Sequence, residues 1–157
     1  MTTAKSEFEG LTALVTGAAG GISLAIAERL ARGGARIVAC DRDQPRLEAA
    51  TRGLAKNTVA VAGDIGSEDG VETLFARAIA QAGTIDILVN GAGIAEPIVR
   101  TVDQKLVDWE RVMDVNLRGT FLVSRAVGRH LLARKAAGAI VNIASVAGIV
   151  GIPGSNL

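Results

Sequence analysis

The chain has 157 residues, a formal net charge of +1 and 49% hydrophobic residues, while only 3% of its residues are aromatic. These values predict one globular domain with a core of Val, Ile, Leu and Ala, which is typical of buried parallel strands with close-packed helices. The sequence shows no basic stripe for nucleic acid, residues 1–7 lack the apolar core of a signal peptide, and the longest mostly apolar run, 139–152, is too short to span a membrane. Cys40 is the only thiol, so we expect a cytoplasmic protein without disulfides.

Strand and helix patterns alternate along the whole chain. The expected strands cover residues 11–16, 35–41, 58–61, 85–90 and 138–144. The expected helices cover residues 22–32, a segment that starts near 43–45, residues 67 to about 81, and one long stretch from near 106 to about 134. Repeated βα units with short connections predict an α/β fold with a doubly wound parallel sheet. We expect the strand order 3-2-1-4-5 in one domain over residues 1–157, which ends after the fifth strand.

A glycine-rich turn joins the first expected strand to the first expected helix. Its sequence is Thr16-Gly17-Ala18-Ala19-Gly20-Gly21-Ile22-Ser23. Such a turn points free backbone N–H groups and the positive end of a helix dipole at one place, where a phosphate can bind without a basic side chain. A glycine cluster alone is weak evidence, and its position between a strand and a helix is what strengthens the prediction. We expect the cofactor to contact Gly17, Gly20, Gly21, Ile22 and Ser23.

Polar residues stand at the carboxyl ends of the other expected strands, where ligands bind in such sheets. They are Asp41, Asp64, Asn90 and Ser145. Asp41 lies 24 residues after Gly17, where a carboxylate accepts the hydroxyls of an adenosine ribose and repels a 2′-phosphate, which favours NAD over NADP. Arg42 argues the other way, whereas position 20, where a basic residue would help to hold the phosphate, is glycine. The alternative is that Asp41 merely caps the following turn.

These motifs together resemble the classical short-chain dehydrogenase/reductase family over nearly the whole chain. The glycine turn is similar to the family's T-G-x-x-x-G-x-G, and Asn90-Gly91-Ala92-Gly93 is similar to its N-N-A-G segment. The other matching segments are Asp64-Ile65, Val115-Asn116-Leu117-Arg118-Gly119 and Ile140-Val141-Asn142-Ile143-Ala144-Ser145.

The resemblance implies an NAD-dependent oxidoreductase that transfers hydride between nicotinamide and a secondary alcohol or carbonyl. It assigns Ser145 to orienting the substrate oxygen and Asn116 to a water-linked proton path. It adds Asp64, Ile65, Asn90, Gly91, Ala92 and Gly93 to the cofactor site. It also implies self-association through the long helix near 106–134.

The sequence departs from the family pattern at three places. Ser23 replaces the third glycine of the turn, so we expect looser helix–strand packing, and Gly91 replaces an asparagine, which removes one amide. The family's main acid/base is a tyrosine followed four residues later by a lysine, and this chain contains no tyrosine. We therefore expect the chain as given to be inactive as a dehydrogenase, and the natural chain to continue past Leu157 or to be completed by a second chain. The alternatives are a non-catalytic NAD-binding module and a fragment without stable function.

The remaining chemically active side chains have ordinary structural explanations. We expect His130 to be a solvated residue or a C-terminal helix residue favoured by the helix dipole, and Cys40 to be a small buried strand residue. We expect Trp109 to pack at the start of the long helix, with a place in a subunit interface as the alternative. The acidic residues around Asp108 form no recognisable metal site. Residues 139–143 form an apolar strand that we expect to be left as an unpaired edge.

Overall fold

A computed structural model describes residues 6–95 and 98–150. Its centre is a five-stranded parallel sheet in the order β3-β2-β1-β4-β5, which confirms the predicted topology. The strands are β1 Thr12–Thr16, β2 Arg36–Asp41, β3 Val59–Ala62, β4 Ile87–Asn90 and β5 Ala139–Asn142. The helices are α1 Gly21–Arg32, α2 Gln44–Thr51, α3 Glu68–Ala82, α4 Leu106–Met113 and α5 Thr120–Ala133.

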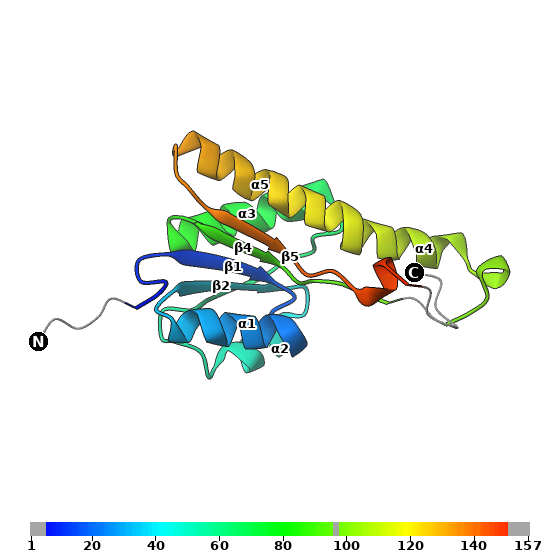
Figure 1. The fold of residues 1–157 in the computed structure, drawn as a ribbon, viewed down its shortest axis with the longest axis horizontal. Helices are drawn as coiled ribbons and strands as arrows, with labels where there is room; N and C mark the ends of the chain where they lie inside the picture. The colour runs from blue at the N-terminus through cyan, green and yellow to red at the C-terminus, as the bar shows by residue number, and fades with distance from the viewer. Residues whose placement is uncertain (1–5, 96–97, 151–157) are drawn as a thin grey trace, which may run out of the picture.

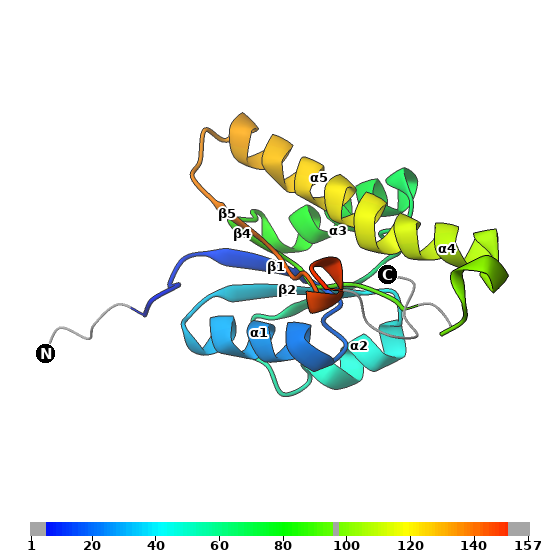
Figure 2. The same cartoon turned by 45° about the vertical axis from the view of Figure 1, so that its right-hand side comes forward.

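Helices cover both faces of the sheet, as Figures 1 and 2 show, with α1 and α2 on one face and α3, α4 and α5 on the other. Alternation along each strand divides the core into two layers. Leu14, Val38 and Leu88 point to the side of α3 and α5. Ala13 and Val15 point to the side of α1 and α2. The small alanines of that second layer let its helices lie close to the sheet.

The helix starts follow from local chemistry. Asp43 caps α2 by accepting the N–H of Arg46 at 3.0 Å, and Pro45 occupies its first turn. Ser67 caps α3 by accepting the N–H of Gly70 at 3.2 Å. The element ends lie within a few residues of those expected from the sequence.

The long helix was predicted as one α-helix over about 106–134, and this is wrong in its middle. Asp114–Gly119 is π-helical and separates α4 from α5. Thr120 Oγ1 donates to the carbonyl oxygen of Asn116 at 2.8 Å, and the Asn116 side chain bonds to the chain after β4. π-Helical turns are rare and occur frequently at functional sites.

The edge strand β5 is as apolar and as exposed as the sequence predicted. Ile140 and Val141 are 41% and 47% exposed, and Ile143, just after the strand, is 39% exposed. On its other side β5 pairs with β4 in register from Ala139 to Asn142. The sheet therefore presents an apolar edge beside the end of the cleft described below.

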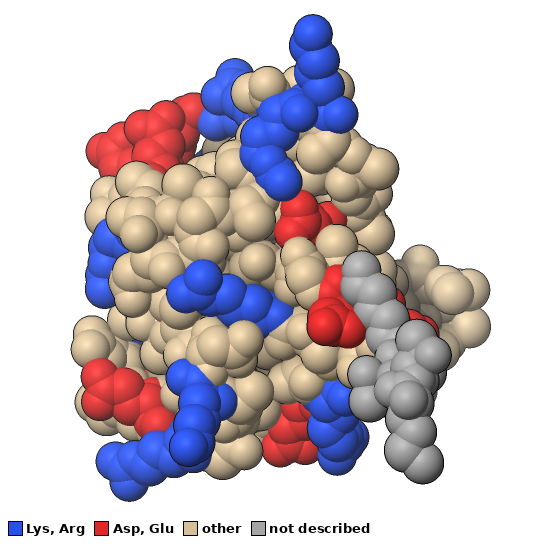
Figure 3. Space-filling model, turned by 90° about the vertical axis from the view of Figure 1, so that its left-hand side faces the viewer, with Lys and Arg blue, Asp and Glu red and all other residues tan. Residues whose placement is uncertain are grey.

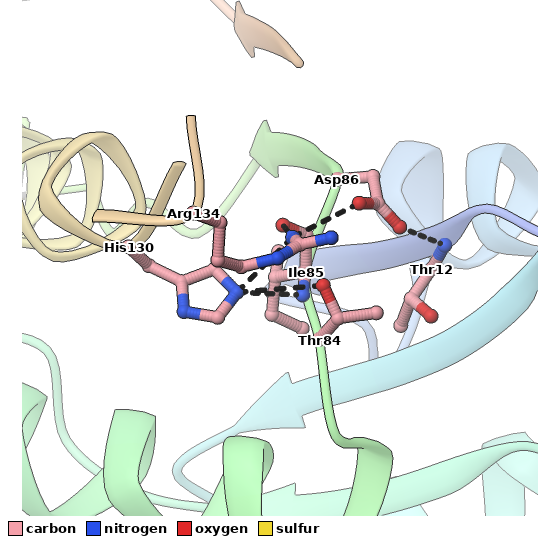
Figure 4. Close-up of polar contacts among 6 residues, drawn as sticks. All are labelled: Thr12, Thr84, Ile85, Asp86, His130 and Arg134. Atoms are coloured by element: carbon pink, nitrogen blue, oxygen red, sulfur yellow. Dashed lines mark hydrogen bonds and ion pairs between the residues drawn. The ribbon is translucent and has the colours of Figure 1, made fainter. Parts of the chain in front are cut away.

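A polar cluster joins the layers at the amino ends of the strands, opposite the cleft (Figure 4). Asp86 accepts the N–H of Thr12 at 3.0 Å and pairs with Arg134 at 3.1 Å. His130 Nε2 accepts the N–H of Ile85 at 3.3 Å, and burial, with the neighbouring Arg134, lowers the pKa of His130 while Asp86 opposes that shift. The expected place at the C-terminal end of the helix is confirmed, but the ring is partly buried, and its Nε2 accepts a main-chain N–H at the start of β4.

On the face of the molecule at this end, Lys and Arg side chains are interspersed with Asp and Glu (Figure 3). A single-sign field does not form on that face. Among the described residues, no helix is long and apolar enough to cross a membrane.

Candidate functional site

A cleft of about 580 Å³ lies at the carboxyl ends of the strands. Eleven of the residues predicted to bind a cofactor line it: Gly17, Gly20, Gly21, Ile22, Ser23, Asp41, Asp64, Ile65, Gly91, Ala92 and Gly93. Thr16, Cys40, Arg42, Arg46, Gly63, Ile94, Val115 and Ile143 complete the lining. The topology explains the convergence, because all the parallel strands end at one edge, and β1 and β4 are the neighbours at which the strand order switches from one side of the sheet to the other.

The glycine turn forms the floor of the cleft. Gly17 has φ +72°, and a Cβ there would lie 2.8 Å from Ala92 Cα, so any other residue would be strained and would push the two loops apart. Helix α1 begins at Gly21 with no side chain capping its first N–H groups and no acidic residue in its first turn. These N–H groups and the helix dipole therefore face the cleft as an anion site.

Thr16 and Ser23 connect this floor to the chain after β4. Thr16 Oγ1 accepts the N–H groups of Gly91 at 3.1 Å and Ala92 at 3.2 Å. Ser23 is only 4% exposed, and a Cβ on Gly91 would lie 2.2 Å from its Oγ. The Ser23 hydroxyl therefore fills the space that the glycine at position 91 leaves free, and looser helix–strand packing stays a prediction.

The Asp41 carboxylate stands at the end of β2 and faces the turn. Its Oδ2 accepts the N–H of Ala19 at 3.2 Å, and its Oδ1 accepts the N–H of Asp43 at 3.1 Å. Both oxygens keep a lone pair, so the group can still accept hydroxyls. Arg46, in the first turn of α2, also lines the cleft, and the sequence did not lead us to expect it there. The signals that could have pointed to it are the glycine at position 20 and an arginine so early in this helix.

Asp64 and Ile65 close the cleft beyond β3. Asp64 is exposed, and its Oδ1 accepts the N–H of Gly66 at 2.9 Å, which fixes the carboxylate at the rim. Ile65 is 7% exposed and belongs to the core. The pair offers one acceptor and one apolar wall.

Asn90 does not line the cleft. It is 4% exposed, and its Nδ2 donates to Ser124 Oγ and to Asn142 Oδ1, both at 2.9 Å. Its buried Oδ1 has no partner among the described residues. Asn90 therefore links β4 to β5 and α5 beneath the site, and the sequence did not point to Asn142 as its partner.

Asn116 lies in the π-helical turn and bonds the main chain of Ile94 twice, accepting from its N–H and donating to its carbonyl oxygen, each at 2.9 Å. Because Ile94 lines the cleft, this reciprocal pair fixes the cleft wall. The Asn116 amide uses one N–H donor and its oxygen in this pair. The main-chain carbonyl oxygen of Asn116 accepts from Thr120 Oγ1.

Ser145 follows β5 and is exposed, two residues beyond Ile143 in the cleft lining. Its Oγ accepts the N–H of Ala147 at 3.2 Å as the cap of a short helical turn, Val146–Gly148. The hydroxyl proton remains able to donate.

Cys40 is 1% exposed, as expected. Burial, reinforced by the nearby Asp41, raises the pKa of its thiol far above the usual range, so it is no nucleophile. No group of three or more potential metal ligands is found among the described residues.

A second hollow lies on the outer face of α4, the π-helical turn and α5. Its residues include Trp109, Leu117 and Phe121, which are 46%, 61% and 58% exposed. Trp109 lies in the first turn of α4 and is partly exposed, so its expected packing there and its alternative place in a subunit interface both stay predictions.

The site fits a nicotinamide dinucleotide on three structural grounds. The turn has no room for a side chain at Gly17, and no side chain caps the first N–H groups of α1 that follow it. A carboxylate stands at the end of β2, where a ribose of the bound nucleotide would lie. The lining combines apolar walls with a few convergent polar groups, as ligand sites do.

Comparison with known proteins agrees with this geometry. The family described as short chain dehydrogenase matches residues 11–157. D-threitol dehydrogenase of Mycolicibacterium smegmatis is 41% identical over 147 residues, which cover 92% of this chain and 56% of that protein. Human 3-hydroxyacyl-CoA dehydrogenase type-2 is 38% identical in an alignment that covers 96% of this chain and 62% of that protein.

Among solved structures, 3-ketoacyl-(acyl-carrier-protein) reductase from Brucella melitensis, complexed with NADH, superposes with a TM-score of 0.84 and 34% identity. The match covers 89% of this chain and 59% of that one. The chain thus spans little more than half the length of these relatives. From the matched motifs, the sheet order and these similarities, the chain belongs to the short-chain dehydrogenase/reductase family.

Proposed function

We propose that the chain is the cofactor-binding part of an NAD(H)-dependent oxidoreductase acting on a secondary alcohol or carbonyl. The observation that carries the proposal is the cleft in which the open start of α1 and the Asp41 carboxylate face one ligand. The uncapped N–H groups at the start of α1 would hold the pyrophosphate, and Asp41 would accept the adenosine ribose hydroxyls. Asp64 and Ile65 would line the adenine, and Gly91 to Gly93 would lie along the remaining length of the cofactor.

The substrate end of the site is proposed around Ser145 and Asn116. When bound, the nicotinamide supplies or accepts the hydride. Ser145 Oγ–H would donate to the substrate oxygen and orient it. Asn116, through its two bonds to Ile94, would hold the wall against which the nicotinamide end rests.

The given sequence contains no tyrosine that could exchange a proton with the substrate oxygen. General acid–base catalysis supplies about 10²–10⁴ in rate, so we expect negligible turnover by the 157 residues alone.

We further propose that the protein is cytoplasmic, because its one thiol is buried and unpaired.

We also propose self-association through the hollow formed by Trp109, Leu117 and Phe121.

Fluorescence titration with NADH tests the binding proposal. We expect saturable 1:1 binding, and about tenfold weaker binding by Asp41→Asn, because charge-assisted hydrogen bonds to the ribose are lost. Asp69→Asn, which removes the same charge from the exposed first turn of α3, is the control and is expected to bind NADH normally. Absence of saturable binding by the folded chain would overturn the proposal. Turnover of NAD⁺ with secondary alcohols by the 157 residues is expected to be negligible, and turnover comparable to that of an intact family enzyme would contradict that expectation.

A further inference from the structure

Asn90 and Gly91, at the carboxyl end of β4, form the only Asn-Gly pair in the sequence. An asparagine before glycine is chemically labile, because glycine has no side chain to hinder the attack of its nitrogen on the asparagine amide carbon. This attack closes a cyclic imide and converts the amide into an acid. The pair is therefore a candidate for covalent change, at an asparagine that does not line the cleft.

The two reacting groups are each bonded to a different partner. The Gly91 N–H donates to Thr16 Oγ1 at 3.1 Å. Asn90 Nδ2, the nitrogen that would leave as ammonia, donates to Ser124 Oγ and Asn142 Oδ1, both at 2.9 Å. The Asn90 side chain must turn toward its own main chain before the ring can close, so these bonds have to open first. The folded state therefore protects the pair.

This protection depends on few contacts. The buried Oδ1 of Asn90 has no hydrogen-bond partner among the described residues, so half of the amide does nothing to hold the side chain in place. Asn142 belongs to β5, the exposed edge of the sheet. Segments with few buried contacts open at a lower free energy than the whole fold does. A local opening at β5 and α5 would free the Asn90 side chain while the rest of the chain stays folded.

We propose that Asn90 is a deamidation site of this chain, which its contacts with Ser124 and Asn142 keep closed and whose conversion weakens the fold. The Gly91 nitrogen forms a bond to Asn90 Cγ, the Cγ–Nδ2 bond breaks, and ammonia leaves with the proton of the Gly91 N–H. Water then opens the cyclic imide at one of its two carbonyl carbons, which gives aspartate or isoaspartate at position 90. No oxidant or reductant is needed, and no nucleotide takes part, so this site is independent of the proposed function.

Both products disrupt the contacts between β4 and its neighbours. A carboxylate at position 90 places an acceptor oxygen where Nδ2 now donates, opposite the Asn142 oxygen, which is itself an acceptor. The hydrogen-bond partners of the Asn90 side chain include no cation to pair with the buried charge. Isoaspartate also lengthens the main chain by a carbon, which shifts the pairing of β4 with β5 and the bond from Gly91 to Thr16.

The first test follows the tryptic peptide of residues 78–100, in which Asn90 is the only asparagine, by mass spectrometry in mildly alkaline buffer. In guanidinium chloride we expect Asn90 to convert well before Asn57, which precedes the β-branched Thr58. In the folded chain we expect conversion to be slower by about tenfold or more, because an opening step comes first. Equal rates in the folded and denatured chains, or no conversion of Asn90 ahead of Asn57 in the denatured chain, would overturn the proposal.

The second test asks whether the contacts of the amide control the folded-state rate. Ser124→Ala removes one partner of Asn90 Nδ2 and is expected to raise that rate severalfold, beyond what its loss of stability in urea explains. Ser67→Ala is the matched control, because it removes a hydroxyl that accepts an N–H at the start of α3. Rates that are equal in the two variants, after correction for their free energies of unfolding, would overturn the proposal.

The third test concerns the effect of the product on the fold. Asn90→Asp reproduces the aspartate product and is expected to unfold at a lower urea concentration than the unmodified chain. Asn57→Asp makes the same change at an exposed position and is expected to leave the unfolding midpoint unchanged. A lower midpoint for Asn90→Asp, or its failure to fold while Asn57→Asp folds, supports the proposal. Equal midpoints for the two variants would overturn the claim that conversion weakens the fold.

Discussion

Replacing Gly91 with alanine is expected to lower the free energy of unfolding by about 1–2 kcal/mol. The new Cβ would lie 2.2 Å from Ser23 Oγ and 3.2 Å from the carbonyl oxygen of Thr16. The first distance is more than 1 Å shorter than an ordinary non-bonded contact, and the carbonyl belongs to β1 and cannot retreat. The Ser23 hydroxyl must therefore leave its place in a buried site.

A double-mutant cycle tests whether the two positions share one space. Ser23→Gly alone is expected to cost about 0.5–1 kcal/mol, because glycine is unfavourable in a helix. In the double variant the alanine meets no hydroxyl, so we expect a coupling of about 1 kcal/mol that makes the pair less destabilised than the sum. Urea unfolding followed by far-UV circular dichroism measures all four chains.

Gly128→Ala is the control for this cycle. Nothing lies within 4 Å of a Cβ at position 128 in α5, so this change is expected to stabilise the chain by about 0.5–1 kcal/mol. If Ser23→Gly and Gly91→Ala are additive to within 0.3–0.5 kcal/mol, the reasoning is refuted, because residues that do not touch behave that way.

Three further results are expected. Asp86→Ala should lower the free energy of unfolding by about 1–3 kcal/mol, because it removes the carboxylate that pairs with Arg134 and accepts the buried N–H of Thr12. Urea unfolding measures this loss, and NADH affinity should not change. Burial lowers the pKa of His130 in the fold, so the unfolded chain binds the proton more readily and stability should fall as the pH drops below about 6.5. Urea unfolding at pH 7.5 and pH 5.5 measures this fall. An equally steep fall in a His130→Gln chain would contradict it. Cys40, whose pKa burial raises, should resist iodoacetamide at pH 8 until urea is added, and rapid labelling of the native chain by mass spectrometry would disprove this.

The sheet could be predicted from the sequence because each strand and helix has its own periodicity and its own punctuation. Short apolar runs, the Asp43 and Ser67 caps and the glycines after helices set the element order, and the βα alternation set the topology. The cleft followed from the same pattern, because residues at the carboxyl ends of parallel strands converge.

The parts that could not be predicted depend on contacts between distant segments. The π-helical turn arises where Asn116 bonds to Ile94, 22 residues earlier, and helix periodicity does not reveal such a bond. The roles of His130 and Asn90 depend on partners in other elements, and so does the meeting of Arg46 with Gly20. The departures at Ser23 and Gly91 looked independent in the sequence because 67 residues separate two atoms that compete for one space.

The most direct test of the central claim is a map of NADH binding on the backbone amides of the chain by heteronuclear NMR. We expect the largest shift changes on Gly17–Ser23 and on the residues around Asp41, Asp64 and Gly91–Gly93. We expect no comparable change around His130 and Asp86, at the opposite end of the sheet. Saturable shifts centred on the hollow beside Trp109, or no saturable shifts in a folded chain, would show that NADH does not bind in the cleft.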